Sequence, residues 1–270
     1  MKITMGLIVF DAIRFLPRDM LVKCLTNMYP HMHEIIVVEG AVLARTGHFD
    51  GDTTSWTKNG KCTDSTIKTI REFPDPEKKI KLIESNGFWD GKPDQMNQYV
   101  KRATGDYIWY VDADEFYKTE DIIKIKEMLT QLKPDCVMFY AQHFWGDFKN
   151  VVPPEETRWG NDIPWQRIHR NERGAKWQRV EPPEYILGDG KRADQGAVIT
   201  RDMTRTAGIF LYHYGYVCWQ QSEFKAKFFR NPAKKVLWEA WQHNHNISIV
   251  NGAKTVPFTG THPEIIKDYL

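Results

Sequence analysis

Short apolar runs that favour β-strands alternate with amphipathic helical patterns through the first half of the chain, and this alternation limits the possible folds more than any other feature. Strands are predicted at residues 2–10, 34–39, 79–84, 107–111 and 136–142. Helices are predicted to open near Pro17, Pro93 and Thr119, where apolar residues recur three and four positions apart. This alternation predicts an α/β fold with a mostly parallel sheet flanked by helices.

The composition is that of an ordinary globular protein and narrows the range of ligands. Hydrophobic residues make up 41% and charged residues 27% of the 270 positions, and the net charge is only +2. Because this balance gives no reason to expect a polyanion partner, any site for a charged ligand must be local. The sequence has neither a signal-peptide pattern nor an apolar run of about 18 residues, which predicts a cytoplasmic protein with no transmembrane segment.

Acidic residues follow four of the predicted strands, at the points where those strands end. The strand ends carry Asp11, Glu39, Glu84 and Asp112. Ligands of open α/β sheets bind beyond the carboxyl ends of the strands. We therefore expect a functional site at this edge of the sheet, where the buried strand at 107–111 delivers Asp112 and Asp114.

Two aspartates one residue apart are a weak signal without their context. Asp50 and Asp52 have the same spacing, but they lie in a segment rich in Gly and Thr, residues 41–64, that we interpret as a loop or a flap over the site. Asp112 and Asp114 differ because they follow a strand of the buried type. The alternative interpretation of this second pair is a turn that caps the following helix.

Hard-cation chemistry explains what a carboxylate pair at a strand end can do. Mg²⁺ and Mn²⁺ prefer oxygen ligands and are commonly held by one or two carboxylates together with substrate phosphates. Lys92, Asp94 and Asn97 gather at the N-terminal end of the preceding helix, and helix N-termini favour anions. These residues are therefore candidates for binding a phosphate-bearing ligand, with a solvated helix face as the alternative for Asp94 and Asn97.

The stretch GKPDQMNQYVKRATGDYIWYVDADEF, residues 91–116, resembles the centre of family 2 glycosyltransferases, in which a polar segment, a helix, an apolar strand and D-x-D-(D/E) follow one another. IIVVEGA is similar to their strand that ends in an acid near the nucleotide base. PWQRIHRNERGAKWQRVEPPEYIL resembles their region with R-x-F/H-R and V-H-E motifs, and HYGYVCWQQSEFKAKFF resembles an H-x-x-Y segment with a lysine-bearing helix. The resemblance covers residues 1–230 and implies a GT-A fold, a nucleotide-sugar donor and a divalent metal, Mn²⁺ or Mg²⁺.

This resemblance implies roles for individual residues. Asp112 would contact the ribose or the metal-bound diphosphate, Asp114 would bind the metal, and His213 would complete the metal shell. The alternative for His213 is a packed histidine in an aromatic strand. Together with the residues at the helix end, the candidate donor-binding residues are Glu39, Lys92, Asp94, Asn97 and Asp112.

The catalytic base is the least determined part of this assignment. Inverting transfer needs a carboxylate within hydrogen-bond reach of the acceptor hydroxyl, on the face opposite the diphosphate. Glu184 aligns with the acid of the V-H-E motif, although Pro183 stands where the histidine would be. Glu181 and Asp189 are the alternatives.

We expect a single domain over residues 1–270, with residues 1–145 binding the nucleotide-sugar and residues 146–270 forming an elaborated acceptor side. Flat aromatic side chains suit the apolar faces of sugar rings, with core packing as the alternative for each. The candidate sugar-stacking residues are Phe88, Trp89, Trp159, Trp165 and Trp177.

The function predicted is metal-dependent transfer of a sugar from a nucleotide-diphosphate sugar, with a UDP-sugar expected, to an acceptor hydroxyl with inversion. One alternative is a metal-dependent nucleotidyl or phosphoryl transferase, because D-A-D-E after a strand also suits a two-metal site. Another is a non-catalytic module that binds glycans or nucleic acid through the basic aromatic residues 158–179. A glycan, a lipid-linked sugar, a protein and modified DNA all stay open as acceptors.

Overall fold

The central feature of the fold is a seven-stranded sheet. The structure is a computed structural model that describes residues 1–43, 53–153, 165–249 and 253–270. In spatial order the strands are β12 (Val198–Ile199), β6 (Cys136–Phe139), β9 (Trp165–Arg170), β4 (Tyr107–Tyr110), β1 (Ile3–Val9), β2 (Glu34–Glu39) and β3 (Ile80–Ile83). Within this described sheet only β9 runs antiparallel to its neighbours. The expected mostly parallel sheet is confirmed.

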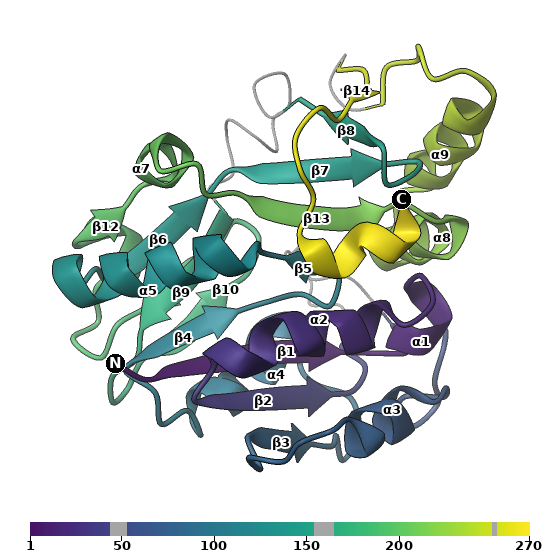
Figure 1. Ribbon diagram of the computed structural model, residues 1–270. Helices are drawn as coiled ribbons and strands as arrows, with labels where there is room; N and C mark the ends of the chain where they lie inside the picture. The colour runs from purple at the N-terminus through teal and green to yellow at the C-terminus, as the bar shows by residue number, and fades with distance from the viewer. Residues whose placement is uncertain (44–52, 154–164, 250–252) are drawn as a thin grey trace.

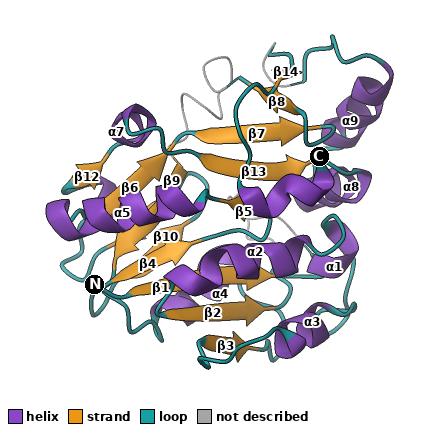
Figure 2. Ribbon diagram, viewed as in Figure 1, coloured by secondary structure: helices purple, strands orange, loops and turns teal. Residues whose placement is uncertain are grey.

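Helices cover both faces of this sheet, so its central strands are buried on each side (Figures 1 and 2). The covering helices are α2 (Met20–Met28) and α5 (Thr119–Leu132) on one face and α4 (Lys92–Val100) on the other. On β2, Ile35 and Val37 belong to the apolar cluster that contains α2, whereas Ile36 and Val38 pack with α4. This division follows because successive side chains of a strand point to opposite faces.

A second sheet stands beside the first and carries much of the C-terminal half. Its spatial order is β14 (Val256–Pro257), β8 (Asn150–Val152), β7 (Ala141–Trp145), β13 (Leu211–Tyr216) and β5 (Glu115–Phe116). β4 ends in the first sheet at Tyr110, and β5 begins in the second at Glu115. The D-A-D-E segment therefore crosses from one sheet to the other, which fixes its aspartates between two rigid layers.

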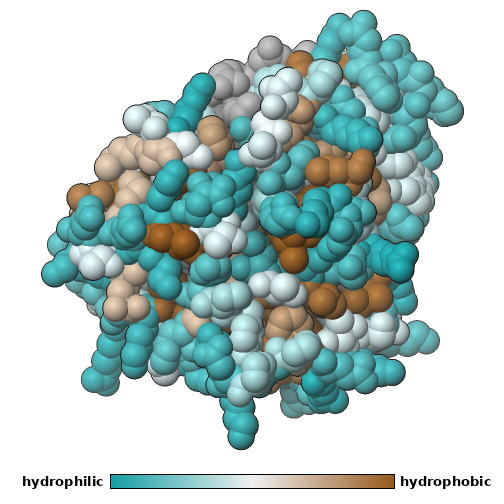
Figure 3. All heavy atoms as spheres, viewed as in Figure 1, coloured by the Kyte–Doolittle hydropathy of each residue, from teal (hydrophilic) through white to brown (hydrophobic). Residues whose placement is uncertain are grey.

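The remaining described elements belong to neither of these two sheets. They are α1 (Ala12–Phe15), α3 (Thr66–Glu72), α7 (Arg201–Thr206), α8 (Trp219–Phe228), α9 (Ala233–His243), the hairpin of β10 (Lys176–Arg179) with β11 (Glu184–Ile186), and 3-10 turns at Tyr29–His31, Ala193–Gln195 and Glu264–Tyr269. The face seen in Figure 3 is mainly hydrophilic, with apolar side chains in small separate groups. None of the helices described is long and apolar enough to cross a membrane.

One predicted strand, residues 136–142, is divided between the two sheets. β6 pairs with β9 and β12 in the first sheet, and β7 pairs with β8 and β13 in the second, with Tyr140 between them. Apolar periodicity shows that a run is extended but not which partner each half pairs with. Asp50, Asp52 and Trp159, singled out above, lie outside the described residues.

Candidate active site

A cavity of about 480 Å³ opens at the carboxyl ends of β1 and β4 and is closed on other sides by β9, β13 and α8. The predicted site residues that line it are Lys92, Asp112, Asp114, Glu181 and His213. Five other predicted residues are not part of its described lining, namely Glu39, Asp94, Asn97, Glu184 and Asp189. The D-A-D-E aspartates therefore share a wall with a helix-end lysine and a histidine from the second sheet.

Asp112 lies at the cavity wall with part of its carboxylate open to solvent. The Tyr110 hydroxyl donates to Asp112 Oδ1 at 2.6 Å, and Arg167 Nη2 lies 3.6 Å from Asp112 Oδ2. The Asp112 side chain is 29% exposed, whereas that of Arg167 is 8% exposed. One edge of the carboxylate is therefore fixed by neighbours, and the cavity side remains accessible to a ligand.

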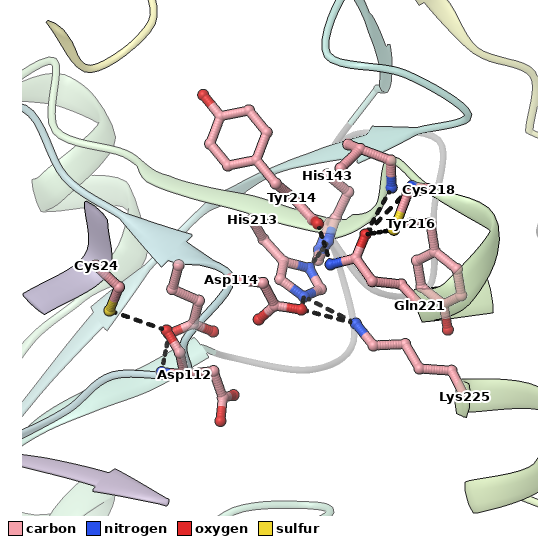
Figure 4. A network of polar contacts seen from close by, with 12 residues as sticks. Cys24, Asp112, Asp114, His143, His213, Tyr214, Tyr216, Cys218, Gln221 and Lys225 are labelled. Atoms are coloured by element: carbon pink, nitrogen blue, oxygen red, sulfur yellow. Dashed lines mark hydrogen bonds and ion pairs between the residues drawn. The ribbon is translucent and has the colours of Figure 1, made fainter. Parts of the chain in front are cut away.

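Asp114 is more deeply buried and faces two nitrogen atoms (Figure 4). Its Oδ2 lies 3.1 Å from Lys225 Nζ and 3.7 Å from His213 Nε2. Burial alone would raise the pKa of Asp114, but the Lys225 ammonium and the neighbouring His213 hold that pKa well below its usual range. The Asp114 carboxylate therefore stays ionised and can pair with a cation.

His213 is oriented by a second histidine, His143 on β7. The two Nδ1 atoms lie 2.8 Å apart, and burial lowers the pKa of each imidazole. Two neutral rings can share such a contact only if one Nδ1 donates and the other accepts. When His213 is the donor, its Nε2 carries the lone pair that faces Asp114 and Lys225, which is the tautomer that can bind a metal.

Glu115 and Arg167 form a buried ion pair next to the aspartates. Arg167 Nε donates to Glu115 Oε2 at 2.9 Å, and Arg167 Nη2 donates to Glu115 Oε1 at 2.5 Å. The guanidinium carbon also lies 4.6 Å from the ring centres of both Tyr110 and Trp165. Burial raises the pKa of Glu115 to about 7. Burial alone would lower the pKa of Arg167, but the neighbouring Glu115 carboxylate outweighs it and raises that pKa above its usual value. The pair fixes the turn that presents Asp112.

Two of the predicted donor-binding residues are engaged with the protein itself. Glu39 is buried and accepts hydrogen bonds from the backbone N–H groups of Cys62 and Ser85, the latter at 3.1 Å. The Asn97 amide donates to the Trp177 carbonyl at 2.9 Å and accepts from the Trp177 N–H at 2.8 Å. In this state both side chains hold neighbouring segments in place, and their contact with a nucleoside stays a prediction.

Lys92 and Asp94 occupy the first turn of α4 but differ in their surroundings. Lys92 lines the cavity, with its Nζ 5.2 Å from the ring centre of Phe228. The Asp94 carboxylate accepts from the Asp90 N–H at 3.2 Å, outside the cavity lining. The lysine is therefore the member of this predicted group that a ligand in the cavity would meet.

The three candidate bases lie on or beside the β10–β11 hairpin, in different surroundings. Glu181 lines the cavity. Glu184 on β11 lies 3.3 Å from Arg179 Nη2 and 4.0 Å from Arg192 Nη1, and Asp189 pairs with Lys191 at 3.0 Å with 48% of its side chain exposed. Which of the three acts as a base stays a prediction, but Glu181 is the one whose carboxylate borders the cavity.

The aromatic candidates also separate by position. Trp165 lines the cavity, whereas Trp177 is only 2% exposed and packs against His169 and Tyr185 in the core. Trp89 donates from Nε1 to the Glu39 carbonyl at 2.8 Å. Among the aromatic candidates in the described part of the chain, Trp165 is the one that lines the cavity.

The residues around Asp114 fit a divalent cation. A carboxylate oxygen and an imidazole nitrogen are both donors that a divalent metal ion accepts. A Cβ added to Gly215 would lie 2.3 Å from His213 Nε2 and 2.4 Å from Lys225 Nζ, so glycine keeps this space open. The Lys225 ammonium occupies this space, at the position that a metal cation would take.

A separate cluster, Asp11, Cys62 and Asp64, also brings three potential ligands together. Both aspartates of this cluster already accept hydrogen bonds from the protein itself. Asp11 accepts from the Thr63 N–H at 2.6 Å and Oγ1 at 2.8 Å, and Asp64 accepts from the Arg14 N–H at 2.8 Å. These hydrogen bonds fasten residues 62–66 to the end of β1 and explain the cluster without a metal.

Residues 57–186 match the model of glycosyl transferase family 2. This match covers just under half of the chain and supports a glycosyltransferase of this family. Among curated relatives, the glycosyltransferase SunS of the SPbeta prophage in Bacillus subtilis (strain 168) is 25% identical over 158 residues, a match that covers 55% of this chain but only 30% of SunS. The chain thus corresponds to less than a third of that relative.

Two solved structures of low sequence identity are similar to this chain. PcManGT, a mannosyltransferase from Pyrobaculum calidifontis in complex with GDP-Man and Mn²⁺, is 14% identical with a TM-score of 0.48, covering 91% of this chain and 70% of that one. TarS 1–349 from S. aureus in complex with UDP is 12% identical with a TM-score of 0.47, covering 91% and 73%. The GT-A arrangement expected from the sequence is confirmed by the family and by the sheet.

Sequence reasoning missed two side chains that line this cavity, Arg167 and Lys225. Arg167 belongs to the stretch that resembles the R-x-F/H-R region, and Lys225 belongs to the lysine-bearing helix. Both signals were present as motifs, but neither indicated which acid each cation would meet.

Proposed function

We propose that this chain catalyses metal-dependent transfer of a sugar from a nucleotide-diphosphate sugar to an acceptor hydroxyl, with a UDP-sugar as the first donor to test. The observation that carries the proposal is the position of Asp112 and Asp114 on the wall of the 480 Å³ cavity, with His213 and Lys92 beside them. The match of residues 57–186 to glycosyl transferase family 2 supports the reaction class, and the cavity lining supports the choice of site.

In this proposal Asp114 and His213 would hold the divalent ion, and Asp112, on the same cavity wall, would bind the ion or a ribose hydroxyl. A bound Mn²⁺ or Mg²⁺ would supply Lewis-acid stabilisation to the departing diphosphate. Lys92 adds a positive charge at the helix N-terminus, a location that favours phosphate. Arg167 acts indirectly, because its buried pair with Glu115 keeps the turn at Asp112 rigid.

We propose Glu181 as the base that removes the proton from the acceptor hydroxyl. A base must lie within hydrogen-bond reach of that hydroxyl, and Glu181 lines the cavity, whereas Glu184 lies outside its described lining and pairs with Arg179 and Arg192. A base on the face opposite the diphosphate would give inversion of the anomeric centre. The acceptor itself is not specified by these residues.

The test is a screen of nucleotide-sugar donors for slow hydrolysis with Mn²⁺ present, using purified protein. Release of free nucleoside diphosphate together with free sugar supports the proposal. Release of pyrophosphate would instead indicate nucleotidyl transfer. Failure of the protein to bind either UDP or Mn²⁺, together with unchanged behaviour of Asp114→Ala, would contradict an enzymatic role for this cavity.

A further inference from the structure

Lys225 on α8 carries its charge at the position that the proposed function gives to a metal. Lys225 Nζ lies 3.1 Å from Asp114 Oδ2 and 3.5 Å from His213 Nε2, and those two ligand atoms are 3.7 Å apart. The three atoms form a closed triangle at the cavity wall (Figure 4). The Lys225 ammonium therefore contacts both atoms that are proposed to bind the metal, Asp114 Oδ2 and His213 Nε2.

The ammonium and a divalent ion cannot share this triangle. Small divalent cations bind their ligands at about 2.1 Å, so an ion held by both Asp114 and His213 must lie between them, next to the ammonium nitrogen. Two cations in contact repel strongly in a buried setting. Gly215 borders this position and leaves room for a single cation, because a Cβ there would lie 2.4 Å from Lys225 Nζ.

The lysine has a path by which it can leave Asp114. Its side chain lines the cavity and is 16% exposed, and its Nζ lies 4.7 Å from the ring centre of Tyr216. A flexible four-carbon stem allows the ammonium to swing into the cavity without movement of α8. There it would join Lys92 on the surface that faces a donor's phosphates.

We propose that Lys225 is the resident counter-cation of Asp114 and that its ammonium and a divalent metal ion occupy this position alternately. An unpaired carboxylate is costly when buried, so the lysine stabilises the site before the metal binds. Metal binding then releases a positive charge toward the donor's diphosphate. The inference rests on the proposed function in assuming that a divalent ion binds Asp114 and His213.

Direct measurement of Mn²⁺ affinity by calorimetry, without nucleotide, tests the competition. Lys225→Met removes the charge and keeps most of the stem, so we expect it to bind Mn²⁺ at least tenfold more tightly than wild type. Lys225→Arg, which keeps the charge, should stay near the wild-type affinity. The matched control is Lys227→Met on the same helix, whose side chain is 55% exposed and pairs with Glu223, and its affinity should not change. Equal or weaker Mn²⁺ binding by Lys225→Met would overturn the proposal.

A measurement on wild-type protein avoids any effect of substitution on folding. Acylation of lysine amines, located by mass spectrometry, should increase at Lys225 when Mn²⁺ saturates the protein and stay constant at Lys227. Unchanged labelling of Lys225 would contradict the alternating occupancy.

Donor hydrolysis separates this inference from the function on which it rests. If Lys225→Met and wild type bind Mn²⁺ equally while wild type releases UDP from a donor, the inference about Lys225 fails and the function stands. If the affinities differ as expected but no donor is hydrolysed, the inference is supported and the function is contradicted.

Discussion

The Glu115 carboxylate and the Arg167 guanidinium meet in a two-point contact with both side chains buried, at 2.9 and 2.5 Å. Glu115 belongs to β5 in the second sheet, and Arg167 belongs to β9 in the first. The pair therefore joins the two sheets at the point where the D-A-D-E segment crosses between them. The position of Asp112 therefore depends on a contact between the two sheets.

Removing one member of this pair should destabilise the protein strongly. Arg167→Met leaves a buried carboxylate without its partner, and such a change costs about 3–5 kcal/mol in the free energy of unfolding. The double variant Glu115→Leu, Arg167→Met removes both charges and should recover most of that loss. Urea unfolding followed by circular dichroism measures both. Equal stability of the single and double variants would show that the pair is not energetically coupled.

Asp114→Asn should abolish metal-dependent activity while the fold persists. The substitution keeps the shape of the side chain but removes the charge that faces Lys225 and His213. Loss of Lewis-acid assistance to the leaving group predicts a decrease of roughly 10²-fold or more in donor hydrolysis. The control is Asp64→Asn, which changes an aspartate of the loop cluster. Normal hydrolysis by Asp114→Asn would remove this residue from the site.

The edge of the sheet that carries the site can be predicted from the sequence, because acids follow several strands of a parallel sheet. The role of each individual acid cannot be predicted in this way. Asp11 and Asp112 give the same local signal, yet Asp11 accepts hydrogen bonds from Thr63, 52 positions away, and is fully buried. Asp112 lines the cavity. The difference arises from how a distant loop packs, which a local pattern does not contain.

The cations of the site were beyond sequence reasoning for a similar reason. Arg167 meets an acid 52 positions away, and Lys225 meets Asp114 across 111 positions. Each contact requires both sheets to be in place, since β9 lies in the first and β13, which precedes α8, lies in the second. Motif resemblance marked these segments, but only the pairing of the strands determines which side chains meet.

Substitution of the three candidate bases should separate their roles. Glu181→Gln is expected to lower transfer to an acceptor by roughly 10²-fold or more, because proton removal by a positioned base typically contributes that much. Nucleotide affinity, measured by UDP titration, should change little. Glu184→Gln and Asp189→Asn are matched controls and should retain transfer. Loss of transfer in Glu184→Gln with full activity in Glu181→Gln would reverse the assignment.

Gly215→Ala should interfere with the metal position specifically. The added Cβ would lie 2.3 Å from His213 Nε2 and 2.4 Å from Lys225 Nζ, both too close for an ordinary contact. One of these side chains must shift, so we expect Mn²⁺ affinity to fall at least tenfold. Calorimetric titration measures this, and Gly190→Ala, with no heavy atom within 4 Å of its Cβ position, serves as a distant comparison for metal binding. Unchanged Mn²⁺ affinity in Gly215→Ala would place the metal elsewhere.

Glu34 should make the stability of the protein depend on acid pH. Burial alone would raise its pKa, but hydrogen bonds from Lys81, Thr104 and Thr4 outweigh burial and lower the pKa from 4.5 to about 2. The unfolded chain therefore binds a proton at this residue before the folded chain does, so the stabilisation is full above about pH 4.5 and declines as the pH falls toward 2. Since the Lys81 side chain is 51% exposed and solvent screens it, we expect about 2 kcal/mol. Urea unfolding of wild type and Glu34→Gln should differ by this amount at pH 6 and converge only as the pH falls to about 2 and below, whereas Glu72→Gln, with a side chain 66% exposed, should match wild type throughout. A constant difference between wild type and Glu34→Gln across this range would mean that the contacts of Glu34 do not distinguish its charged form.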